Sequence, residues 1–194
     1  MLVVELQNDL VHESVAERRG LAGALARAVR DRGVVSRLAG LLDACRAASV
    51  PVLYATKERE PGREPPGTAP IHRMSGPDPI LVAGTWGAQV VDQVAPREGD
   101  VVLPRLESID PSHGSDLWPT VERLGLTTLV VAGISTTLAV EGTVRGAANR
   151  GYRAVVVEDC CASVPEEWHR FSADNVLPLL SDVVSARDVI GALG

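Results

Sequence analysis

The chain has 194 residues with 19 basic and 25 acidic side chains, which gives a formal net charge of −6. This length suits one domain over residues 1–194, and the 45% hydrophobic content is enough for a sizeable core. A mildly acidic chain without a run of Lys or Arg lacks the electrostatic footprint of a nucleic-acid-binding protein. No apolar stretch reaches the roughly 18 residues of a membrane span, and no basic region precedes the first apolar run. We therefore expect a cytoplasmic protein without a signal peptide.

The first predicted elements alternate between strand and helix. Residues 1–6 form an apolar run that stops at the polar Gln7-Asn8-Asp9, which predicts a strand. Apolar residues recur at helical spacing over residues 33–48, and residues 51–55 predict a second strand. Residues 58–79 break this rhythm with six prolines and little periodicity. A loop of this length is usually functional or disordered, so it is either a lid or subunit contact or a mobile surface excursion.

The alternation continues to the end of the chain. The remaining predicted elements, in order, are a helix around residues 88–94, a strand over 100–103, a helix over 116–124, a strand over 127–132, a helix over 136–150, a strand over 154–157, a helix over 165–180, a strand over 182–184 and a last helix from residue 186. Short apolar strands that alternate with helices predict an α/β fold with a parallel sheet covered on both faces.

The cysteines do not predict disulfides. There are three, Cys45, Cys160 and Cys161, and neighbouring cysteines rarely bridge because the geometry is strained. We expect buried thiols in a reducing compartment.

Polar side chains end several predicted strands. Ligands bind open parallel sheets at the carboxyl ends of the strands. The first strand ends in Glu5, the third runs into Arg105, and the fourth ends in Gly133-Ile134-Ser135-Thr136-Thr137 and turns directly into a helix. Together these groups would form an acid/base site with an anion pocket. A glutamate in an apolar strand also costs stability unless it is paired, so Glu5 and Arg105 could instead be a structural ion pair.

Three motifs fall in order on these strands. Residues 3–10 read V-V-E-L-Q-N-D-L, Arg105 is followed by Gly114-Ser115-Asp116-Leu117, and residues 133–143 read G-I-S-T-T-L-A-V-E-G-T. Over nearly its whole length the chain resembles the isochorismatase-like, or cysteine hydrolase, family. The resemblance implies a three-layer α/β/α fold with a six-stranded parallel sheet in the order 3-2-1-4-5-6. It also implies a homodimer or a higher homo-oligomer.

The chain departs from the family at its catalytic positions. The resemblance implies a triad of Asp, Lys and Cys, in which the thiolate attacks a carbonyl, and here those positions are Glu5, Arg105 and Ala139. Alanine offers no nucleophile, which excludes the covalent thioester route, and Arg105 can stabilise an anion but cannot shuttle protons. True isochorismatases also lack the cysteine and use the acid of the first strand.

Two hypotheses remain. The chain is either a hydrolase that acts on a small polar or anionic metabolite, with Glu5 as general acid/base and Arg105 as anion stabiliser, or an inactive pseudoenzyme or small-molecule binding module. Hydrolysis without a covalent intermediate needs further polar groups in the pocket. The candidates are Gln7, His113, Ser135 and Thr136, although His113 could also be a solvent-exposed loop residue.

Other kinds of site have weaker support. Residues 133–137 resemble a nucleophile elbow but lack its second glycine, and Cys160 or Cys161 with His169 could form a thiol site. The four histidines show no metal-ligand spacing, and no phosphate-binding glycine loop is present. We expect no metal, no organic cofactor and no nucleic-acid or membrane partner.

Overall fold

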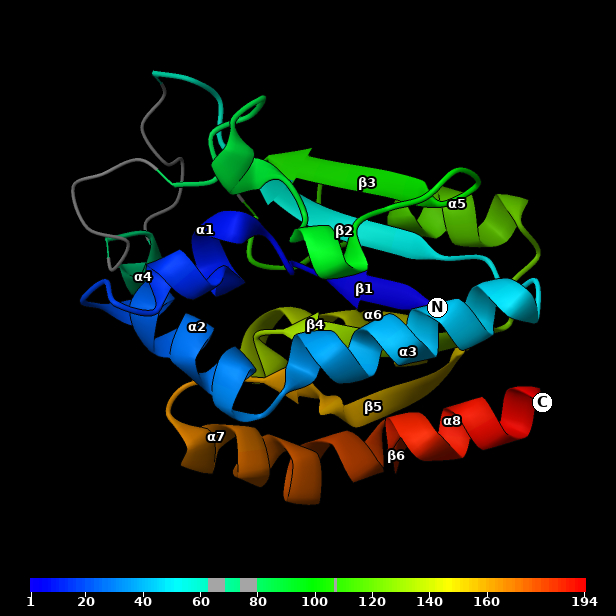
Figure 1. Ribbon diagram of the computed structural model, residues 1–194. Helices are drawn as coiled ribbons and strands as arrows, with labels where there is room; N and C mark the ends of the chain where they lie inside the picture. The colour runs from blue at the N-terminus through cyan, green and yellow to red at the C-terminus, as the bar shows by residue number, and fades with distance from the viewer. Residues whose placement is uncertain (63–68, 74–79, 107) are drawn as a thin grey trace.

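The computed structural model describes residues 1–62, 69–73, 80–106 and 108–194. Its centre is a parallel sheet with the strand order β3-β2-β1-β4-β5-β6 (Figure 1). The predicted strand order is therefore confirmed. The strands are β1 Leu2–Val4, β2 Leu53–Glu58, β3 Val101–Leu106, β4 Thr128–Ile134, β5 Arg153–Ala162 and β6 Asp182–Val184.

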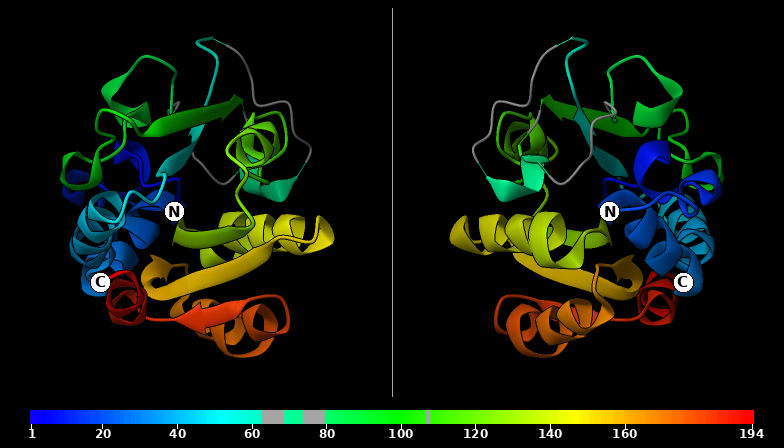
Figure 2. Two further views of the ribbon diagram at one scale, coloured as in Figure 1. Left: turned by 90° about the vertical axis from the view of Figure 1, so that its right-hand side faces the viewer. Right: turned by 90° about the vertical axis from the view of Figure 1, so that its left-hand side faces the viewer.

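Helices cover both faces of this sheet. The α-helices of the described residues are α1 Asn8–Val11, α2 Leu21–Asp31, α3 Val34–Ala47, α4 Pro70–Arg73, α5 Leu117–Arg123, α6 Glu141–Asn149, α7 Glu166–Phe171 and α8 Ala186–Leu193. Figure 2 shows α3 and α8 on one side of the strands and α5 and α6 on the other. In the described part of the chain, no helix is both long enough and apolar enough to cross a membrane.

The middle of the sheet is buried on both faces, as a parallel sheet between helices requires. Leu2, Val3 and Val4 of β1 are each at most 1% exposed. The core around them is aliphatic, and the three cysteines are free and buried within it. The prediction of buried thiols is therefore confirmed.

Several predicted elements need correction. The first strand ends at Val4 instead of Leu6, and β5 continues to Ala162 instead of ending near residue 157. Only the first part of the helix expected over residues 165–180 is α-helical, as α7, and the chain then continues as a π-helical turn over residues 172–176. Helix α2 was not predicted, although Leu21, Leu25 and Val29 recur at helical spacing.

The helix predicted around residues 88–94 is wrong. Val90 instead forms an antiparallel bridge with Gln7, and the Val91 N–H donates to the Leu6 carbonyl at 3.0 Å. Only short 3₁₀ turns flank this bridge, at residues 86–88 and 92–94. Pairing with the chain just after β1 therefore overrides the local apolar pattern.

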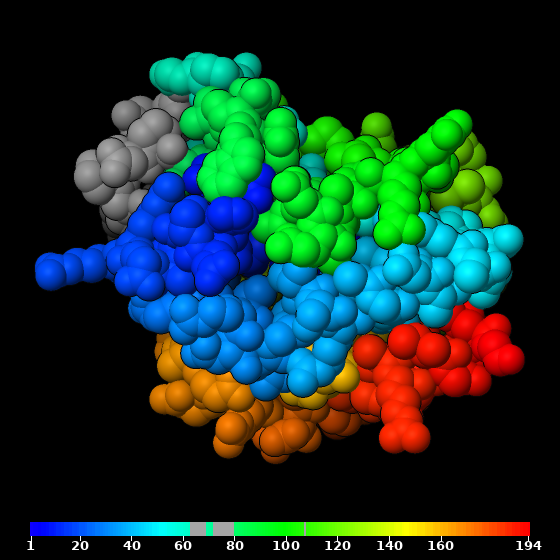
Figure 3. All heavy atoms as spheres, in the orientation of Figure 1, coloured from blue at the N-terminus to red at the C-terminus, as the bar shows by residue number. Residues whose placement is uncertain are grey.

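The strands are parallel, the arrows of β2 and β3 point to the left in Figure 1, and α1, α2 and α4 lie beyond the carboxyl edge of the sheet. Figure 3 shows the face over the sheet closed by side chains of α1, α2 and α3, in blue to cyan, above those of α7 and α8 in orange and red. Much of the proline-rich segment 58–79 lies outside the described residues, so its role as a lid or subunit contact stays a prediction.

Candidate active site

Glu5 stands at the point where the chain leaves β1. Its backbone adopts a left-handed conformation with φ of 53°, which costs a residue other than glycine about 1–3 kcal/mol. The Glu5 N–H still donates to the Ala55 carbonyl at 3.0 Å, and the Glu5 carbonyl accepts from the Gln7 N–H at 2.9 Å. These bonds hold the kink, which ends the strand and places the Glu5 side chain in a pocket at the carboxyl edge of the sheet.

Gly133 allows β4 to approach this kink closely. It lies opposite Val4 in the sheet register, and its φ is 122°. A Cβ atom at this position would lie 2.1 Å from the Val4 carbonyl oxygen. Only glycine fits, and the following turn, residues 135–139, is therefore held against the end of β1.

The pocket at this edge has a volume of about 270 Å³. Polar groups reach it from the ends of the strands, and apolar side chains reach it from the surrounding helices and loops. The polar lining residues are Glu5, Lys57, Arg59, Ser135, Thr137 and Ser163. The apolar ones are Leu10, Leu21, Ala22, Leu25, Ile71, Ile80, Leu81, Ile109, Leu138, Ala139, Val164 and Trp168.

Arg105 lies behind Glu5 and outside the pocket lining. Its side chain is fully buried and forms an ion pair with the Glu5 carboxylate, which is 13% exposed. Two other guanidinium nitrogens also bond within the protein: Nη1 donates to the Thr56 carbonyl at 3.2 Å, and Nε donates to the Ser108 hydroxyl at 3.1 Å. Arg105 therefore orients the carboxylate and offsets the cost of its burial.

Of the other predicted site residues, Ser135 lines the pocket, whereas Gln7, His113 and Thr136 lie outside its lining. Ser135 lines the pocket with Glu5 and Ala139. Gln7 is buried, and its side-chain amide bonds to the backbone of residue 57 and to the Ala88 carbonyl. His113 is exposed and lies outside the pocket lining, so of the two alternatives for this residue the structure favours the solvent-exposed loop histidine.

Thr136 is buried on the far side of the same turn. Its hydroxyl lies 2.8 Å from Nδ1 of His169, whose Nε2 lies 2.6 Å from a carboxylate oxygen of Glu158. Because a carboxylate only accepts hydrogen bonds, Nε2 of His169 donates to Glu158. Arg32 also pairs with Glu158, at 2.6 Å. The hydrogen bond from His169, helped by Arg32, lowers the pKa of Glu158 to about 2.

Both ring nitrogens of His169 are used in this network, so His169 is not placed to act as a base for Cys160 or Cys161. His169 bonds to Thr136 and Glu158, and burial raises the pKa of Cys160 to about 12 and that of Cys161 further. Both thiols are fully buried. A reactive thiolate needs the opposite environment.

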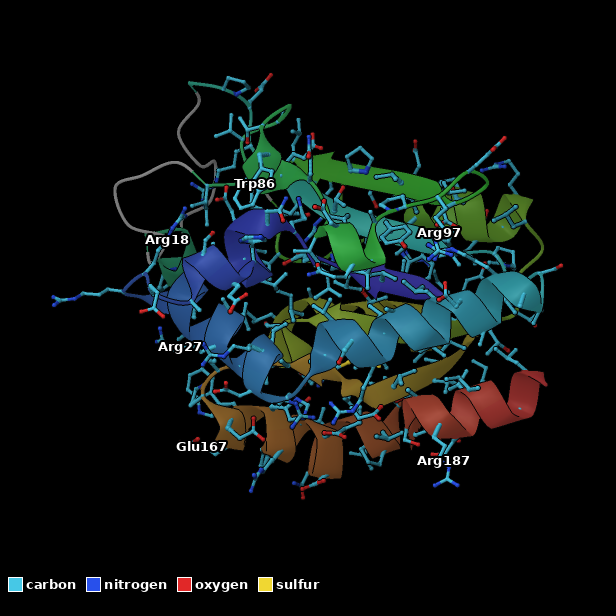
Figure 4. All side chains as sticks on the ribbon, in the orientation of Figure 1. Arg18, Arg27, Trp86, Arg97, Glu167 and Arg187 are labelled. Atoms are coloured by element: carbon cyan, nitrogen blue, oxygen red, sulfur yellow. The ribbon has the colours of Figure 1, made fainter. Side chains whose placement is uncertain are left out.

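The apolar part of the pocket was not predicted from the sequence. Leu21, Ala22 and Leu25 come from α2, which was not predicted, and Trp168 comes from the first turn of α7. The spacing of Leu21 and Leu25 could have indicated a helix, but nothing local shows that it crosses the carboxyl edge of the sheet. Trp86 lies outside the pocket lining. It is beside α1, and its ring packs edge-on against that of His12 (Figure 4).

Comparison with known proteins defines the class. The isochorismatase-domain family model matches residues 1–188. The chain is 30% identical over 177 residues to the ureidoacrylate amidohydrolase RutB of Methylobacterium radiotolerans, covering 81% of this chain and 67% of that protein. The chain belongs to the isochorismatase family.

Solved structures agree in fold. An isochorismatase family protein from Desulfovibrio vulgaris has a TM-score of 0.82 at 24% identity, with 99% of this chain and 96% of that chain covered. N-carbamoylsarcosine amidase from Thermoplasma acidophilum has a TM-score of 0.71 at 22% identity, with 95% and 94% covered. These identities are low, so the two likenesses concern the fold.

Proposed function

We propose that this chain hydrolyses a small molecule by non-covalent acid/base chemistry, with Glu5 as the general acid/base. The observation that carries the proposal is the kinked, ion-paired Glu5 carboxylate in an open pocket whose lining includes Ala139 and no thiol. Two of the proteins compared above are named as an amidohydrolase and an amidase. These names favour a carbon–nitrogen bond as the target, with an ester or vinyl ether as other candidates.

The proposed reaction needs no covalent enzyme intermediate. For an amide, the Glu5 carboxylate takes a proton from a water molecule while the water oxygen bonds to the carbonyl carbon. The carbon–nitrogen bond then breaks, and Glu5 returns the proton to the leaving nitrogen. One water is consumed, an acid and an amine are released, and Glu5 is again a carboxylate. Ser135 lines the pocket, and its hydroxyl is the proposed donor to the oxyanion.

Arg105 was predicted to stabilise an anion, and in this proposal that anion is the Glu5 carboxylate. The guanidinium acts on the substrate only through Glu5, because the Arg105 side chain is fully buried and lies outside the pocket lining. Arg105 is thus proposed as a positioning residue for the base.

Replacement of the carboxylate tests the proposal. Wild type is first screened by mass spectrometry against amides, ureides, esters and vinyl ethers. Glu5→Gln keeps an acceptor oxygen for Arg105 but cannot take a proton, so kcat on any hit should fall by about 100-fold or more. Glu17→Gln, at an exposed carboxylate, should keep the wild-type rate.

Circular dichroism must accompany these rates because Arg105 is fully buried. A folded Glu5→Gln protein with wild-type kcat would refute the proposal. A wild-type protein that binds these compounds and converts none would favour the binding-module alternative.

A further inference from the structure

The pocket lining combines polar residues near the ends of strands, here called the floor, with a larger set of apolar residues, here called the walls. The floor consists of six polar residues at or near strand ends: Glu5 after β1, Lys57 and Arg59 at the end of β2, Ser135 and Thr137 after β4, and Ser163 after β5. We infer that the substrate is a molecule with an apolar body that carries one hydrolysable polar group. This inference rests on the proposed function and names its substrate class.

Helix α2 supplies the longest stretch of wall. Leu21, Ala22 and Leu25 line the pocket together, and residues spaced by three or four positions lie on one face of a helix. Leu138 and Trp168 also line the pocket, and they are 41% and 60% exposed. An apolar ligand that covers exposed apolar side chains removes their surface from water, and this stabilises the complex.

The charged residues of the lining, Glu5, Lys57 and Arg59, belong to the floor, and α2 contributes none of them. Arg105 was expected to attract an anion, but its guanidinium lies outside the lining. Lys57 and Arg59 line the pocket, and each has interactions within the protein. A charged group placed against the α2 wall would lose hydration without a partner. An apolar body avoids this cost.

The volume limits the size of that body. At about 270 Å³, the pocket is slightly smaller than most ligand sites, which are usually about 300–1,000 Å³. This space suits a ring or a short alkyl chain together with one amide or ester group. A peptide segment or a nucleotide would be too large.

A homologous series of ligands tests this inference. Binding of acetamide, butanamide, hexanamide and octanamide to the Glu5→Gln protein is measured by titration calorimetry, which excludes turnover. Each methylene that reaches the wall should tighten Kd by about fourfold until the pocket is full. Amides with a terminal hydroxyl or carboxylate on the same chain should lose most of this gain.

Matched variants locate the effect. Trp168→Ser and Leu138→Ser should each weaken binding of the longest amide by about tenfold and leave that of acetamide unchanged. Phe171→Ser and Leu179→Ser are the controls, because these side chains are 63% and 81% exposed and lie outside the lining. The control variants should bind like the parent protein.

The outcomes separate this inference from the proposed function. Affinity that is independent of chain length, or absent for every amide, overturns the apolar substrate class even if wild type hydrolyses small polar amides. Chain-dependent binding that is lost in the wall variants supports it. If such ligands bind but wild type converts none of them, the ligand class stands and the hydrolase proposal fails.

Discussion

At the scale of single residues, Glu5 carries two costs that a regular strand would avoid. Its left-handed backbone is strained, and its carboxylate requires a fully buried arginine as its partner. A buried ion pair is often no more stable than apolar residues of the same volume. The kink and the pair are therefore better explained by the placement of a carboxylate in the pocket than by the stability of the sheet.

Ala139 gives the first residue-scale prediction. Ala139→Cys would place a thiol in the pocket lining that already contains Glu5. Iodoacetamide should modify the folded variant once, at residue 139. Folded wild type should stay unmodified because its cysteines are buried and burial raises the pKa of Cys45, Cys160 and Cys161. Peptide mass spectrometry identifies the site.

Denatured protein provides the control, since unfolding should expose every cysteine to the reagent. Labelling of Ala139→Cys at the wild-type rate would show that position 139 is closed to small molecules. The pocket described above would then be too narrow for the proposed substrate.

At the scale of elements, most strands could be predicted because a buried parallel strand needs a short apolar run. Strand β6 has the predicted bounds, while β5 was cut short because Glu158 and Asp159 look like a strand end. Their sequence does not reveal that Arg32 and His169 pair with Glu158 from two other elements.

The sequence likewise predicted one part of the candidate site, the polar residues at strand ends, and missed the other, the apolar walls. Glu5 and Ser135 could be predicted because they end strands, and strand ends meet at one edge of the sheet. The apolar walls could not, because the position of α2 depends on contacts with α1 and α3 that no local pattern encodes. The bridge between Gln7 and Val90 is another long-range contact that replaced a plausible helix.

The link between β5 and α7 predicts a pH dependence of stability. The folded pKa of Glu158, about 2, is below its ordinary value of 4.5, so the ionised group stabilises the fold above about pH 4.5. This contribution is lost as the pH falls toward 2. Because the carboxylate is 35% exposed, solvent screening reduces this contribution to the free energy of unfolding to about 1 kcal/mol.

Urea unfolding at pH 7 and pH 3 measures this effect. Glu158→Gln should lose less stability than wild type between the two pH values. Glu167→Gln, at an exposed carboxylate one helical turn or less from His169, should follow wild type. An unchanged pH dependence in Glu158→Gln would contradict the assignment.

At the scale of the whole molecule, the outer face of β3 predicts self-association. Val102 and Leu106, on the same side of this edge strand, are 45% and 53% exposed, whereas strands of parallel sheets are usually covered on both faces. A second copy of the chain would cover them, in agreement with the homo-oligomer expected from the sequence. Light scattering at micromolar concentration should give at least a dimer mass.

Val102→Lys combined with Leu106→Lys should lower that mass toward the monomer. Phe171→Ser, which alters an exposed apolar residue elsewhere, should not. A monomeric wild type would remove the basis for this prediction.

The register between Val4 and Gly133 has a consequence for the order of folding. These residues are roughly 130 positions apart in the chain, yet they are direct neighbours in the sheet. During synthesis, β1 leaves the ribosome early and can pair with β2, while its other edge stays open until β4 has emerged. Long loops are slow to close, so the contact that brings Ala139 to Glu5 should be among the last to form. The pocket would then form only after most helices are in place. A nascent chain halted before β4 would expose the unpaired apolar edge of β1 to neighbouring chains on the polysome.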